Sequence, residues 1–115
     1  MNVLSLLVLK AVDPSALARF YAKLGLTFVQ EQHGSGPIHL SCHVGESVFE
    51  IYPRSASEMP TSGTRIGFRV PSVADAISAC DAPILMAARP SQWGIRAVIE
   101  DPEGHKVELS QSFCV

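Results

Sequence analysis

The chain has 115 residues, of which 47% are hydrophobic and 17% are charged, and its formal net charge is −2. This length suits one domain with its own core and is too short for two independent domains. Because there is no basic excess, we expect no nucleic-acid partner.

Residues 3–9 form an apolar run of strand length. No basic region precedes it, and Asp13-Pro14 ends it far short of a membrane span, so we expect neither a leader nor a membrane anchor. Asp13 and Pro14 suit the N-cap and the first position of a helix. Its apolar stripe runs through Leu17 to Leu24, and Gly25 ends it. Strands are then predicted at residues 26–32, 38–44 and 47–52, with glycine turns between them.

The same order of elements repeats after residues 53–63, which form the only linker-like segment. Ser72 and Asp75 form an approximate capping box for a second helix, which Pro83 closes. Trp93, the only tryptophan, falls in a predicted loop over residues 89–94. Strands are predicted at residues 64–70, 84–88, 95–100 and 105–111.

Both halves therefore predict the order strand–helix–strand–strand–strand. One such half cannot cover its own sheet, so two halves must pack together. We predict an α+β fold of two βαβββ modules, at about residues 1–53 and 64–115. The linker 54–63 joins them into one domain over residues 1–115.

Two motifs resemble signatures of the vicinal oxygen chelate superfamily, which includes glyoxalase I, bleomycin-resistance proteins, extradiol dioxygenases and fosfomycin-inactivating enzymes. Phe20-Tyr21-x-x-Leu24-Gly25-Leu26 resembles its first-helix signature. Trp93-Gly94 followed by Asp101-Pro102-Glu103-Gly104-His105 resembles its second-module signature. The resemblance covers the whole chain and implies a cup of curved sheet from each module, often completed by a second subunit, with a small ligand inside.

The resemblance also implies where a metal would bind. Metal-binding members of the superfamily carry ligands on the first and last strands of each module. The two last-strand ligands correspond to Glu50 and Glu108. By spacing from the two motifs, the first-strand ligands fall near Leu6 and Arg65. Neither side chain can bind a metal, because leucine has no lone pair and arginine offers only donors.

The histidines offer no replacement on the sequence evidence. His39 and His43 are four residues apart on one strand, about 13 Å at about 3.3 Å per residue, which is too far to share one ion. Two carboxylates without an imidazole make a poor transition-metal site. We therefore expect no bound divalent metal and no other cofactor. The three cysteines, Cys42, Cys80 and Cys114, are scattered, which favours a reducing cytoplasm over a disulfide frame or zinc site.

The candidate site residues each have two interpretations. Arg65 and Glu108 form either a structural ion pair or an anchor in which Arg65 binds a ligand carboxylate or phosphate. Glu50 is either a general base or a hydrogen-bonded structural residue, and His39 is more simply structural. Tyr52 and Trp93 either wall an aromatic ligand or belong to the rim or core. The candidate ligand-binding set is Leu6, His39, Glu50, Tyr52, Arg65, Trp93 and Glu108.

Two functions fit these residues. The loss of both first-strand ligand positions favours a metal-free binding protein of the bleomycin-resistance type, which holds a partly apolar, charged small molecule. The alternative is a glyoxalase-like lyase or isomerase that uses Glu50 and Glu108, with or without a metal. The apolar first strand near Leu6 and Val8 needs cover, so we expect a homodimer with two-fold symmetry.

Overall fold

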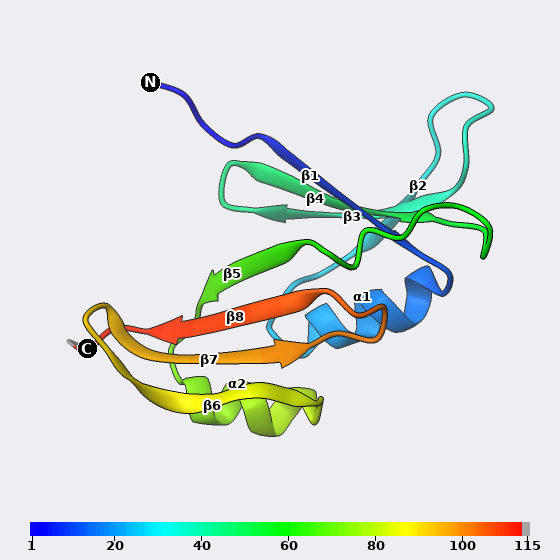
Figure 1. Cartoon of the computed structure of the whole chain (residues 1–115). Coiled ribbons are helices and arrows are strands. Elements are labelled where there is room, and N and C mark those ends of the chain that lie inside the picture. The colour runs from blue at the N-terminus through cyan, green and yellow to red at the C-terminus, as the bar shows by residue number, and fades with distance from the viewer. Residues whose placement is uncertain (114–115) are drawn as a thin grey trace. The chain divides into compact units, whose positions relative to one another are not determined.

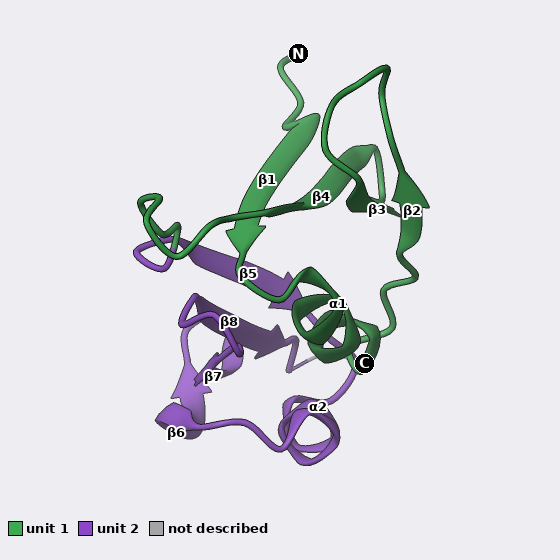
Figure 2. Ribbon diagram, turned by 90° about the vertical axis from the view of Figure 1, so that its right-hand side faces the viewer, with its two compact units in different colours: residues 1–61 green, residues 62–115 purple. Residues whose placement is uncertain are grey.

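The computed structural model describes residues 1–113; Cys114 lies outside the described residues. The chain divides into two compact units, residues 1–61 and 62–115 (Figure 2). The boundary falls inside the segment predicted as a linker. Neither helix in the described part of the chain is long and apolar enough to cross a membrane.

Each unit has one helix and one four-stranded sheet, in the predicted βαβββ order (Figure 1). The first unit contains β1 (Leu6–Ala11), α1 (Pro14–Ala22), β2 (Val29–Glu31), β3 (His39–Val44) and β4 (Ser47–Pro53). The second contains β5 (Arg65–Arg69), α2 (Val73–Cys80), β6 (Ile84–Ser91), β7 (Gly94–Glu100) and β8 (Lys106–Gln111). The sheet orders are β1-β4-β3-β2 and β5-β8-β7-β6, and in each sheet only the first pair is parallel. The predicted α+β fold with two repeated modules is confirmed.

Local capping signals place both helices. The Asp13 carboxylate accepts a hydrogen bond from the backbone N–H of Ala16 at 3.1 Å, and the Ser72 hydroxyl accepts one from Asp75 N–H at 3.1 Å. Each bond satisfies an N–H that would otherwise lack a partner at a helix start. α1 ends at Ala22, before the predicted end at Leu24.

The predicted loop over residues 89–94 is wrong for its first half. β6 continues through Ser91 and forms a hairpin with β7, which begins at Gly94. Arg89 and Pro90 looked like loop residues. β6 is one of the two edge strands of its sheet, however, and an edge strand tolerates proline because its outward N–H needs no partner. Trp93 therefore lies in a tight turn between two strands.

Each helix covers one face of its own sheet. In the first unit Tyr21 packs edge-to-face on Phe49, with ring centroids 5.0 Å apart. Leu9 and Ile51 are fully buried on the same face. Because side chains alternate along a strand, Val8, Glu50 and the other residues out of phase with this core lie on the opposite face. The second unit repeats the pattern, with Val107 and Leu109 buried and Glu108 on the other face.

The Asp101–His105 turn is a buried hydrogen-bonded unit that leads into β8. One Asp101 carboxylate oxygen accepts from the backbone N–H groups of Glu103 and His105, both at 3.0 Å. The other lies 2.9 Å from Nδ1 of His105, and both side chains are fully buried. Gly104 takes the positive φ of 91° that the turn requires. This motif therefore fixes the start of β8 and with it the direction of Glu108.

Candidate functional site

Two groups of polar residues lie on the sheet faces that the helices leave uncovered, one group in each unit. In the first unit Glu31, His33, His39 and Glu50 form what we call the His39 cluster. One nitrogen or oxygen atom from each of the four lies within 4.8 Å of the others. Glu31 on β2 is directly opposite His39 on β3, and Glu50 on β4 is opposite Ser41, two residues further along β3.

His39 is the buried centre of this cluster, with 2% of its surface exposed. Its Nδ1 lies 3.2 Å from the carbonyl oxygen of Pro37. A carbonyl only accepts, so Nδ1 must carry the proton that it donates. The other ring nitrogen, Nε2, is buried without a hydrogen-bond partner and lies 3.4 Å from a carboxylate oxygen of each of Glu31 and Glu50.

Tyr52 forms one wall of the His39 cluster. Its ring stacks on the His39 imidazole, with centroids 4.2 Å apart and planes inclined by 8°. Burial raises the pKa of the Tyr52 hydroxyl, and the negative charges of Glu50 and Glu31 raise it further. The two carboxylates therefore give this face of the first sheet a negative charge.

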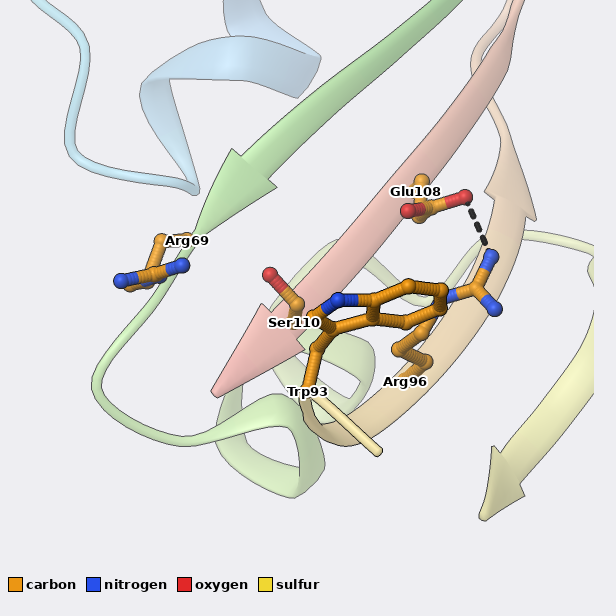
Figure 3. Close-up of a pocket in the computed structure, with 5 residues that line it drawn as sticks. All are labelled: Arg69, Trp93, Arg96, Glu108 and Ser110. Carbon is orange, nitrogen blue, oxygen red and sulfur yellow. Dashed lines mark hydrogen bonds and ion pairs between the residues drawn. The ribbon is translucent and has the colours of Figure 1, made fainter. Parts of the chain in front are cut away.

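A pocket of about 440 Å³ lies in the second unit. We call it the Trp93 pocket; it is lined by Arg69, Trp93, Arg96, Glu108 and Ser110 (Figure 3). Arg69 is opposite Ser110 on β8, and Ser110 is in turn opposite Arg96 on β7. The sheet register therefore places one arginine on each of the two strands that flank β8.

Arg96 is the main partner of Glu108. Its Nη2 donates to Oε1 of Glu108 at 2.7 Å, the length of a strong charge-assisted hydrogen bond (Figure 3). Its guanidinium carbon lies 5.9 Å from the Trp93 ring centroid, within reach of a cation–π contact. The expected neighbour, Arg65, is 3.6 Å from the same oxygen and has a side chain that is 54% exposed. The Arg65–Glu108 pair is therefore present but is the weaker of two.

The structure brings five of the seven sequence-based candidates into these two groups. His39, Glu50 and Tyr52 meet in the first unit, and Trp93 and Glu108 meet in the second, with Arg65 beside Glu108. Leu6 belongs to neither group: it begins β1 opposite Val48 and is exposed. The residues that sequence reasoning missed are Glu31, His33, Arg69, Arg96 and Ser110.

The internal repeat contains a signal that identifies Arg96. Ser41 is opposite Glu50 in the first sheet, and Val98 is opposite Glu108 in the second. His39 precedes Ser41 by two residues, as Arg96 precedes Val98. The two residues therefore occupy equivalent places beside equivalent glutamates, which an alignment of the modules by their hairpin register would reveal.

Three of the four positions at which the resemblance implies metal ligands, Leu6, Arg65 and Glu108, do not suit a metal in this chain. Leu6 offers only hydrocarbon, and Arg65 directs a guanidinium toward Glu108. Glu108 already accepts a hydrogen bond from Arg96. One premise from the sequence is nevertheless wrong. We argued that no imidazole accompanies the glutamates, whereas His39 Nε2 lies 3.4 Å from Glu50, because the register of β3 and β4 places Glu50 opposite Ser41, two residues from His39.

Comparison with known proteins gives one family and many similar structures. The family model described as Glyoxalase/Bleomycin resistance protein/Dioxygenase superfamily matches residues 4–109. No curated protein sequence gives a significant match. The fold is similar to TnmS3, an antibiotic binding protein from Streptomyces sp. CB03234, at 18% identity and a TM-score of 0.77, over 97% of each chain.

Two further structures extend this likeness. A bleomycin-binding protein complexed with bleomycin aligns at 20% identity and a TM-score of 0.64, over 97% of this chain and 99% of that one. An integron cassette protein from the mobile metagenome of V. cholerae aligns at 21% identity and a TM-score of 0.70, over 96% and 95%. At these identities the likeness concerns the fold.

Proposed function

The chain belongs to the Glyoxalase/Bleomycin resistance protein/Dioxygenase superfamily, and we propose that it binds a small, partly apolar anion in the Trp93 pocket, without a metal in that pocket. The observation that carries this proposal is the lining of the pocket. An indole ring, two guanidinium groups, one carboxylate and one hydroxyl surround about 440 Å³, a volume suited to a small organic molecule.

The charge balance of the pocket favours an anion. Arg69 and Arg96 contribute two positive charges, while Glu108 contributes one negative charge. The planar guanidinium group offers paired donors that match a carboxylate or phosphate. A ligand anion would accept hydrogen bonds from Arg96, which also donates to Glu108, and would form an ion pair with the exposed Arg69. The indole face of Trp93, which is 65% exposed, would cover the apolar part of the ligand.

The structural neighbours support the class of function and leave the ligand open. One is described as an antibiotic binding protein, and another is a complex with bleomycin. These two proteins of the same fold bind small molecules. We infer the same class of activity for this chain.

The alternative is a glyoxalase-like lyase or isomerase that uses Glu50 and Glu108. A general base needs a free oxygen within hydrogen-bond reach of the substrate proton. One of the two carboxylate oxygens of Glu108, Oε1, already accepts a hydrogen bond from Arg96 at 2.7 Å. This contact favours binding over catalysis at Glu108.

The fluorescence of Trp93 tests the proposal directly, because it is the only tryptophan in the chain. We expect phenyl phosphate or 2-naphthoate to change this fluorescence saturably, and benzylamine, which carries the opposite charge, to have no effect. Arg69→Met should weaken the binding of the anion at least about tenfold, since a charge-assisted contact contributes about 1.5–3 kcal/mol to the binding free energy.

Arg19→Met is the matched control, because Arg19 is an exposed residue of α1 in the other unit. It should leave the affinity unchanged. If no anion in the panel gives a saturable change at millimolar concentration, or if benzylamine binds as tightly as the anions, the proposal fails.

We also propose a homodimer in a reducing, cytoplasmic setting. Leu4, Leu6 and Val8 are exposed along β1 and the segment before it, which supports burial against a second copy. Cys42 is a buried free thiol, which supports a reducing compartment.

Sedimentation should show a dimer at tens of micromolar protein, roughly where a standard-size interface persists. Leu6→Glu should shift it to monomer, because a charge cannot be buried unpaired. Met59→Glu, which changes an equally apolar exposed residue in a loop, should not. A monomeric wild-type protein under these conditions would rule out the dimer.

A further inference from the structure

The His39 cluster is not explained by the binding function proposed above, and it lies entirely in the first unit. Of its four residues only Glu50 is at a superfamily metal position. The other three come from β2, from the residues that follow it, and from β3. The cluster therefore poses a separate chemical question: what neutralises its two carboxylates around a buried imidazole?

Within residues 1–113, no lysine or arginine forms an ion pair with Glu31 or Glu50; their charged partners are histidines alone. His39 Nδ1 is committed to the Pro37 carbonyl. The lone pair of a neutral His39 ring therefore lies on Nε2, which is buried and faces two acceptor groups. A lone pair directed at two carboxylates is unfavourable unless a cation lies between them.

A protonated His39 is the simpler candidate for that cation, and the distances count against it. A charge-assisted N–H···O bond to a carboxylate is about 2.7–2.9 Å long. Both carboxylate oxygens are instead 3.4 Å from Nε2, and Nε2 makes no hydrogen bond. The group is therefore spaced more widely than a direct ion pair would be.

The same distances match three of the six edges of a tetrahedral metal site. Ligands about 2.0–2.2 Å from a zinc ion at tetrahedral angles lie about 3.3–3.6 Å from one another. Three of the six separations are in this range: 3.4 Å for His39–Glu31, 3.4 Å for His39–Glu50 and 3.6 Å for His33–Glu31. All six lie within 4.8 Å, so zinc would draw the other pairs closer together. The Nδ1 bond from His39 to a backbone carbonyl is also the usual second contact of a metal-bound histidine.

We propose that the His39 cluster binds one divalent transition-metal ion, zinc in the first instance. The ligand atoms are Nε2 of His39, Nε2 of His33, Oε1 of Glu31 and Oε2 of Glu50. Two carboxylates balance the charge of the ion, and two imidazoles select zinc over magnesium, which prefers oxygen ligands. The ion would tie the β2–β3 connection, which carries His33, to the middle of the first sheet.

The test is zinc binding to the full chain after dialysis against a chelator. Calorimetric titration should give one equivalent of zinc per chain, and Mg²⁺ should not compete. Zinc should also raise the melting temperature of the wild-type protein. His33→Gln and Glu31→Gln should each weaken zinc binding at least about tenfold, since even outer-shell partners of a metal alter affinity 10–100-fold.

These two substitutions leave the fold testable, because His33 is exposed and Glu31 is half-buried. His43→Gln is the matched control: His43 is an exposed histidine on the same strand as His39 and lies outside the cluster. It should leave zinc affinity and the zinc-induced rise in melting temperature unchanged. Absence of one-to-one binding to the wild type, or equal weakening by His43→Gln and His33→Gln, would overturn the site. Neither result bears on anion binding in the Trp93 pocket.

Discussion

Replacing Gly94 with alanine should destabilise the protein by about 3–5 kcal/mol, the sum of backbone strain and overpacking. Gly94 has a φ of +121°, which a residue with a side chain rarely adopts. A Cβ at this position would also overlap the backbone carbonyl of Gln111. The glycine lets β8 pass close to the turn that holds Trp93, so the site and the fold depend on the same residue.

Two other glycines separate the two causes. Gly45 has a φ of +59° with nothing within 4 Å of its Cβ position, so Gly45→Ala tests strain alone and should cost about 1 kcal/mol. Gly63 has neither feature, and Gly63→Ala should change stability by less than about 0.5 kcal/mol. Urea unfolding of the three variants measures their losses of stability, which should fall in the order Gly94→Ala, Gly45→Ala, Gly63→Ala. A loss for Gly94→Ala no larger than that for Gly45→Ala would contradict the clash with Gln111.

Arg96→Met should cost about 2 kcal/mol, because it removes a charge-assisted hydrogen bond from a carboxylate that is mostly buried. The side chains of Arg96 and Glu108 are 23% and 27% exposed. Arg65→Met should cost less than about 1 kcal/mol, since that residue is largely exposed and further from Glu108. The comparison ranks the two arginines by the same substitution.

The double variant Arg96→Met with Glu108→Leu identifies the source of the loss. If an unpaired Glu108 causes it, then removing that charge as well should recover most of the stability. Thermal and urea unfolding of the single and double variants give the coupling free energy between Arg96 and Glu108. An Arg65→Met loss equal to or larger than that of Arg96→Met would contradict Arg96 as the main partner of Glu108.

Local signals in the sequence were sufficient for the fold. Asp13 and Ser72 cap the two helices as their sequence context predicts, because a cap involves residues only three apart. Alternation placed Glu50 and Glu108 on the faces away from the core. The loop prediction for residues 89–94 failed because Pro90 is compatible with a strand only at the edge of a sheet, and sequence alone does not say which strand is at the edge.

The site required information that no local pattern carries. Arg96 reaches Glu108 because the register of β7 and β8 places Val98 opposite Glu108 and Arg96 one step away on the same face. Glu31 meets His39 because the register of β2 and β3 places the two residues directly opposite each other. A one-residue change of register would turn each of these side chains to the other face.

Nuclear magnetic resonance of the ¹⁵N-labelled protein tests the proposed small-molecule site most directly. The chain has one tryptophan, so its spectrum contains one indole N–H signal. Titration with phenyl phosphate or 2-naphthoate should shift that signal together with the side-chain Nε–H signals of Arg69 and Arg96. The backbone signals of Glu31 and His39 should stay in place. Saturable shifts confined to the first unit, or none at millimolar ligand, would contradict binding in the Trp93 pocket.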